Sequence, residues 1–159
     1  MNFFLEKGLQ KLGRWLRFLG YKVYFVDRAD NFKKFIRSAD VDKTIIVTTS
    51  RKISDYLKSR KIEHILVPRD SWEFQLFLVI KRLNIKPELK LNICVYCNNN
   101  LKEIDKEIVK DKLPRGVLLT GKDFTKCDHC GAIFWKGSHY RRMVEKLERI
   151  LRKYNSLLD

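Results

Sequence analysis

The chain has 159 residues, which is enough for one hydrophobic core with a small appended module. Its 34 Lys and Arg against 19 Asp and Glu give a formal net charge of +15, which favours a polyanionic partner, with nucleic acid as the first candidate. No apolar run reaches the length of about 18 residues that a membrane span needs, and the N-terminus lacks the pattern of a secretory signal. We therefore expect a cytoplasmic protein with no membrane partner and no small-molecule cofactor.

The positive charge is spread along the chain. Residues 1–90 hold 20 basic and 10 acidic side chains, and residues 91–159 hold 14 and 9. An anionic membrane surface is the alternative partner, but only the C-terminal segment is close to the amphipathic anchor that such binding requires. Both halves are expected to touch the partner, or to share one extended basic face.

Residues 1–86 alternate between short apolar runs and segments with helical spacing. Strands are predicted at 2–5, 22–26, 44–48 and 64–68, and helices are predicted at 9–19, 31–39, 52–60 and 72–83. Gly20 is expected to end the first helix. Strands that alternate with helices predict an α/β domain over residues 1–86, with a mostly parallel sheet flanked by helices.

Ligands of such sheets bind beyond the carboxyl ends of the strands. The expected ends carry Glu6, then Asp27 and Asp30, then Ser50, then Asp70. Carboxylates that separate strands bring together can hold a divalent ion such as magnesium or manganese. The alternative is that Asp30 and Asp70 cap the helices that follow them.

The only cysteines in the chain form two C-x-x-C pairs, Cys94 with Cys97 and Cys127 with Cys130. This pattern predicts a zinc ribbon over residues 87–137, in which four thiolates hold one structural ion. The 29 residues between the pairs exceed the common spacing of about 15 to 20, so an excursion is expected around residues 112–123. Disulfides are one alternative, and they fit a reducing compartment poorly. A redox pair is the other, but a redox C-x-x-C normally opens a helix of a thioredoxin-like unit, and neither pair is expected to do so.

Residues 138–159 predict an amphipathic basic helix. Met143, Leu147, Ile150, Leu151 and Tyr154 form its apolar stripe. Trp135 either stacks on a base or packs the ribbon onto the first domain, and the sequence leaves both open. The candidate RNA contacts are Lys7, Lys11, Arg14, Trp135, Lys136, His139, Arg141, Arg142 and Arg149.

Several motifs occur in a characteristic order: "FFLEKGLQKLGRWLRFLGYKV", "IIVTTSRKI", the two C-x-x-C pairs and "WKGSH". In these motifs the chain resembles the family named for the C-terminal ribonuclease domain of the Mut-seven protein. The resemblance implies a PIN-like domain with a zinc ribbon and a metal-dependent ribonuclease activity. It also implies an Asp after the first strand and another in a "TRD" motif after the third. Here Glu6 and Ser50 stand at these two positions, and Asp30 falls near a third acidic position.

Ser50 supplies no anion, so we expect an RNA-binding protein of this family whose nuclease activity is weakened or lost. Its expected partner is structured RNA, such as that of a ribosomal subunit. The first alternative is an active endoribonuclease in which Glu6, Asp30 and Asp70 hold magnesium or manganese. The second is a toxin of a toxin–antitoxin pair, which rests on fold analogy alone.

Overall fold

The structure is a computed structural model that describes residues 1–26 and 43–157. Its α/β part is built on four parallel strands, β1 (Asn2–Glu6), β2 (Lys22–Val26), β3 (Thr44–Thr48) and β4 (His64–Leu66), in the order β2-β1-β3-β4. This confirms the predicted parallel sheet flanked by helices. The helix predicted at 31–39, with Asp27 and Asp30, lies outside the described residues.

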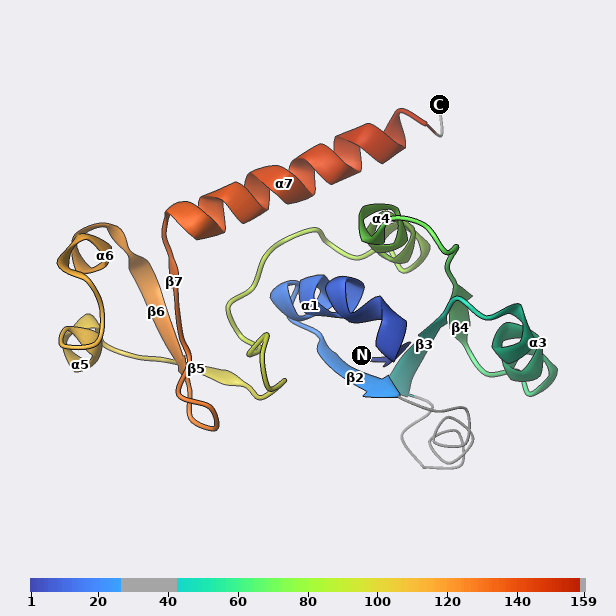
Figure 1. Ribbon diagram of the computed structural model, residues 1–159, viewed down its shortest axis with the longest axis horizontal. Helices are drawn as coiled ribbons and strands as arrows, with labels where there is room; N and C mark the ends of the chain where they lie inside the picture. The colour runs from blue at the N-terminus through green and yellow to red at the C-terminus, as the bar shows by residue number, and fades with distance from the viewer. Residues whose placement is uncertain (27–42, 158–159) are drawn as a thin grey trace.

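Successive side chains of the central strands point to opposite faces of the sheet, and both faces are buried. Phe3 and Leu5 of β1 pack into the larger core, whereas Phe4 points to the opposite face and packs with Leu57. Helix α1 (Gln10–Phe18), entered through the 3-10 turn η1 (Lys7–Leu9), and helix α4 (Trp72–Arg82) cover the first face. Helix α3 (Arg51–Ser59) covers the second (Figure 1). Each face therefore has its own apolar cluster, as expected for a parallel sheet.

Helix α1 ends at Gly20, as predicted. Gly20 has a φ of +89°, and the Tyr21 N–H donates to the Leu16 carbonyl across the turn, which is typical of a glycine-terminated helix. A Cβ at this position would lie 2.8 Å from the Asn92 side chain. Gly20 thus allows the chain leading to the cysteines to pack closely against the end of α1.

The cysteine module, residues 93–136, contains a second, antiparallel sheet. Strands β5 (Leu101–Glu103), β6 (Lys122–Cys127) and β7 (Ile133–Lys136) pair in that order. The expected excursion between the cysteine pairs consists of two short helices, α5 (Lys106–Val109) and α6 (Arg115–Thr120), which lie at the outer end of the module (Figure 1).

The last helix, α7 (Ser138–Asn155), leaves the cysteine module and runs back across α4 (Figure 1). Its predicted apolar stripe is confirmed: Leu147 joins the core of the α/β part, and Ile150 and Tyr154 pack with Phe77 of α4. None of the helices in the described residues is long and apolar enough to span a membrane.

Candidate functional site

The carboxyl edge of the parallel sheet is organised around Glu6. β1 and β3 pair in a register that places Leu5 opposite Val47, so Glu6 reaches the residues that end β3. The Thr48 hydroxyl donates to one carboxylate oxygen of Glu6. The Thr49 hydroxyl and backbone N–H donate to the other oxygen, at 2.9 and 3.3 Å. Both oxygens of Glu6 are therefore held by hydrogen bonds from the end of β3.

Ser50 begins the helix that follows this strand. Its side chain accepts a hydrogen bond from the Ile53 N–H at 3.4 Å, which makes it the N-cap of α3. Its own N–H donates to the Thr48 hydroxyl oxygen at 3.0 Å. The residue at the position of the expected acid is thus part of a hydrogen-bonded chain that runs from Glu6 through Thr48 to α3.

A cavity of about 590 Å³ opens beside these residues. Arg51 and Arg69 line it from two different segments, the start of α3 and the loop after β4. No acidic residue is among its lining residues, which are Thr49, Ser50, Arg51, Leu66, Val67, Pro68 and Arg69. The guanidinium groups of Arg51 and Arg69, with the hydroxyl proton of Ser50, are suited to bind an anion with several oxygens, such as a phosphate group.

The other predicted acids of this edge are placed only in part. Asp70 is exposed, and its carboxylate accepts the N–H of Ser71, the N-cap of α4. Asp30 is not described. In residues 1–26 and 43–157, the cysteines form the only group of three or more His, Cys, Asp or Glu whose ligand atoms converge. A magnesium or manganese site built by Glu6, Asp30 and Asp70 stays a prediction.

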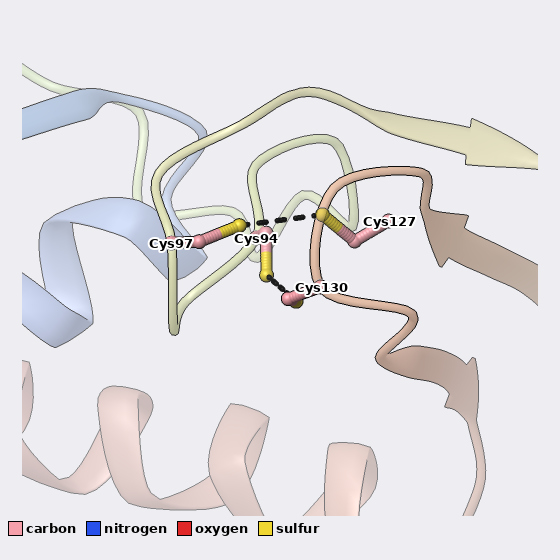
Figure 2. A group of neighbouring side chains, drawn as sticks. All are labelled: Cys94, Cys97, Cys127 and Cys130. Atoms are coloured by element: carbon pink, nitrogen blue, oxygen red, sulfur yellow. Dashed lines mark hydrogen bonds between the residues drawn. The ribbon is translucent and has the colours of Figure 1, made fainter.

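The four cysteines converge from two turns of the cysteine module (Figure 2). Their sulfur atoms all lie within 4.8 Å of one another. The Sγ atoms of Cys94 and Cys130 are 3.5 Å apart, and those of Cys97 and Cys127 are 3.3 Å apart. All four thiols are free, so the cluster can hold a metal ion such as zinc.

The surroundings of the cluster act on its thiols in opposite directions. The Asn99 side chain and backbone hydrogen-bond to the sulfur of Cys97 and lower its pKa to about 5. Burial raises the pKa of Cys94 to about 12 and also raises that of Cys127. Asn99 therefore favours thiolate at the rim of the cluster, whereas a cation is needed to stabilise negative charge on the buried sulfurs.

Arg17 of α1 joins the first cysteine turn to the α/β part. Its guanidinium donates to the carbonyls of Val95 at 2.9 Å and Val23 at 2.8 Å. Its Nε is buried without a hydrogen-bond partner. Burial lowers the Arg17 pKa, and the nearby Cys94 and Cys97 act in the opposite direction. Arg17 thus places positive charge next to the thiol cluster.

Asn98 makes a second connection. It has a φ of +67°, and its side-chain oxygen accepts the Val23 N–H at 2.8 Å. Val23 lies on the outer strand of the parallel sheet, so Asn98 satisfies a backbone donor at an otherwise open sheet edge. The cysteine turn is therefore docked on the sheet by directed polar contacts.

The predicted RNA contacts lie on several parts of the surface. Trp135 is half-buried and stacks on Phe124 with ring centroids 6.3 Å apart, so it packs within the cysteine module. The other predicted contacts are exposed: Lys7, Lys11, Arg14, Lys136, His139, Arg141, Arg142 and Arg149. Their contact with RNA stays a prediction.

The sequence reasoning missed Arg17, Arg51, Arg69 and Asn98. Arg51 directly follows an N-cap, where acidic residues are the more usual choice, and this departure is the one local signal that could have drawn attention to it. Arg17, Arg69 and Asn98 act through contacts between segments that are distant in the sequence, and no local motif marks them.

Comparison with protein families finds one matching model. Residues 1–147 match the model described as the Mut7-C RNAse domain, and this match spans the sheet edge, the cysteine cluster and about the first half of α7. No curated protein and no solved structure matches the chain.

Proposed function

Because the chain belongs to the Mut7-C RNAse domain family, we propose that it binds RNA through a nuclease-like sheet edge whose catalytic activity is weakened or lost. The observation that carries this proposal is the bonding of Glu6, whose two carboxylate oxygens are held by Thr48 and Thr49. Structured RNA, such as that of a ribosomal particle, is the proposed partner.

A hydroxyl-lined edge is a poor site for a catalytic magnesium ion. Such ions are held by one or more carboxylates that leave positions open for water and phosphate. Glu6 already accepts three hydrogen bonds from Thr48 and Thr49, and Ser50 is neutral and caps α3. Metal binding here would have to break the bonds from Thr48 and Thr49 without gaining a second charge from residue 50.

The same edge suits a phosphate group. Arg51 and Arg69 line the cavity beside Ser50, and no carboxylate lines it. An RNA phosphate can displace the water molecules that hydrate both guanidinium groups and accept charge-assisted hydrogen bonds from them. Together with the net charge of +15, this supports binding of the RNA backbone without cleavage.

We also propose that the four cysteines hold structural zinc, and that residues 93–136 form a zinc ribbon beside a PIN-like domain. Tetrahedral zinc with Zn–S bonds of about 2.3 Å separates its sulfurs by about 3.8 Å. The 3.3 and 3.5 Å between paired sulfurs and the 4.8 Å limit for the whole group are compatible with that geometry. Four thiolates leave no open coordination position, so the ion would stabilise the fold and take no part in catalysis.

An active metal-dependent endoribonuclease is the second candidate. It is favoured by the family match and by the position of Glu6 at the carboxyl end of β1. In this case Glu6, Asp30 and Asp70 would hold magnesium or manganese, and Ser50 would orient a water molecule. Glu6 would have to exchange its hydrogen bonds from Thr48 and Thr49 for the ion.

An RNA cleavage assay with magnesium or manganese separates the two candidates. The proteins to compare are the wild type, Glu6→Gln, Ser50→Asp and Ser50→Asn. Asp and Asn both cap helices well, so Ser50→Asn controls for folding while only Ser50→Asp adds a negative charge. We expect salt-sensitive RNA binding by the wild type and no cleavage. Cleavage by Ser50→Asp alone would show that the acid at position 50 is what the site lacks.

Cleavage by the wild type that disappears in Glu6→Gln would overturn the binding proposal in favour of the active enzyme. RNA affinity that does not change between low and high salt would contradict both, because phosphate contacts release counterions. Arg51→Ala and Arg69→Ala should each reduce the salt slope by about one.

A further inference from the structure

An apolar pocket lies where the cysteine module, α1 and α7 meet, away from the sheet edge proposed to bind phosphate. Its volume is about 220 Å³, below the roughly 300 to 1,000 Å³ of sites for drug-sized ligands. A planar group the size of one nucleobase suits this space better than a whole nucleotide. Most of the lining side chains are aromatic or aliphatic: Phe18, Leu89, Leu91, Val95, Tyr96, Ile133, Phe134, Trp135, His139, Tyr140 and Met143.

The aromatic rings at this pocket stack on neighbouring rings, and one of them is largely open to solvent. Tyr96 is 68% exposed, and its ring lies over that of Phe134 with centroids 5.9 Å apart and planes 28° apart. Trp135 is held by Phe124 and by Gly137, where a Cβ would come within 2.7 Å of the indole. Rigid rings with free surface are good platforms for an unpaired base, because little side-chain freedom is lost on stacking.

Polar groups of the pocket come from the start of α7. His139 lines the pocket, and its two ring nitrogens can hydrogen-bond the edge of a base. The Tyr140 hydroxyl donates to the Leu89 carbonyl at 3.1 Å, which ties α7 to the segment that precedes the cysteines. The wall formed by Tyr140 and Leu89 is thereby held in position.

The charge around the pocket favours a polyanion. Its lining contains no carboxylate. Arg17 donates to the carbonyls of Val95 and Tyr96, both of which are lining residues. The acids on neighbouring positions are ion-paired: Glu88 with Lys86 at 2.8 Å, and Asp123 with Lys136 at 2.7 Å. The exposed Lys90 and Arg141, next to lining residues in the chain, leave an excess of positive charge.

We propose that this pocket receives one unpaired base of a bound single-stranded or looped RNA, with Tyr96 and Phe134 as the stacking platform. The proposal rests on the proposed RNA-binding function and gives it a second, charge-independent contact. It assigns RNA with unpaired bases as the preferred class, because base pairs in a duplex cannot leave the stack without cost.

The test uses the full chain and a short single-stranded RNA that carries one 2-aminopurine, whose fluorescence falls when it stacks on an aromatic ring. Tyr96→Ala and Phe134→Ala are compared with Tyr24→Ala, which removes another exposed tyrosine, from β2. We expect Tyr96→Ala to weaken single-strand binding by about tenfold and to restore the fluorescence. Duplex RNA binding and the salt slope should not change, because no phosphate contact is lost.

The outcomes separate this proposal from the function on which it rests. Salt-dependent binding by the wild type, with Tyr96→Ala and Phe134→Ala behaving as Tyr24→Ala does, would overturn the pocket and leave RNA binding intact. The pocket would then be free to serve a protein partner. Absence of RNA binding by the wild type would overturn both. Since Tyr96 is largely exposed, thermal unfolding of Tyr96→Ala should match the wild type, and fluorescence quenching in the wild type gives a readout that needs no variant.

Discussion

The α/β part and the cysteine module are stabilised in different ways. The sheet of residues 1–82 buries two apolar clusters, with fully enclosed side chains such as Phe3, Leu12 and Ile46. The cysteine module buries few large side chains, chiefly Ile93, Val109 and Phe124, and its centre is the thiol cluster. A small module with so little apolar core needs a further stabilising element, such as a bound metal ion. Loss of a bound metal should therefore destabilise the cysteine module far more than the α/β part.

Removal of the proposed zinc ion is the strongest way to test this contrast. Cys94→Ser, or a zinc chelator, should unfold the cysteine module, because structural zinc contributes about 10 kcal/mol or more to such folds. Amide hydrogen exchange should show lost protection in β6 and β7 and retained protection in β1 and β3. Equal loss in both sheets would mean that the α/β part depends on the metal as well. Zinc released by the wild type, measured as one ion per chain, is the matched control.

Truncation of a buried side chain on α7 should cause the next largest loss of stability. Ile150→Ala removes packing against Phe77 and Tyr154, and we expect it to lower the free energy of unfolding by about 2 to 5 kcal/mol. The loss should appear in the α/β part, although Ile150 follows the cysteines in the chain. Arg149→Ala, on the exposed side of the same helix, is the control and should change stability by less than about 0.5 kcal/mol. A similar loss in both variants would contradict the packing seen here.

The joint between the two parts can be weakened at Asn98. Asn98→Ala removes the bond to the Val23 N–H and places alanine at positive φ, which together should cost about 2 kcal/mol. Asn98→Gly removes only the hydrogen bond, so it should cost about 1 kcal/mol. Urea unfolding of both variants measures the difference. If glycine were the more damaging substitution, the backbone at this turn would not be the reason for asparagine.

The smallest effect is expected at the N-cap of α3. Ser50→Ala removes the bond to the Ile53 N–H and should destabilise the protein by about 1 kcal/mol. Ser50→Asn should leave the stability within about 0.5 kcal/mol of the wild type, since asparagine caps equally well. Thermal unfolding in parallel distinguishes them. Equal stability of all three proteins would show that the cap contributes nothing measurable.

The strands and the cysteine cluster could be predicted because their signals are local. The run "TIIVT" is β-branched along its whole length and apolar at its centre, and β3 is buried on both faces. The C-x-x-C spacing likewise brings its own ligands together. Ser50 was interpreted as a missing acid or as a residue that positions water, although a serine before a helix is also a standard N-cap signal.

The bonding of Glu6 could not be predicted, because it depends on strand order and register. Glu6 meets Thr48 only because β1 lies beside β3 with Leu5 opposite Val47, and 37 residues lie between these two strands in the chain. The pocket at Tyr96 has the same origin, since it joins residues of α1, β7 and α7. The division of the chain at residues 86 and 137 stays a prediction.

The path of α7 has a consequence for how the protein is made. The core of the α/β part includes Leu147, and its α4 side is covered by Ile150 and Tyr154, all of which follow the cysteines in the sequence. Chains are synthesised from the N-terminus onward at about 5 to 20 residues per second. The apolar surface of the α/β part that α7 covers therefore stays exposed for several seconds, while the cysteines and α7 are being synthesised. Early metal capture would hold the start of α7 beside α1 and shorten the search for its final position.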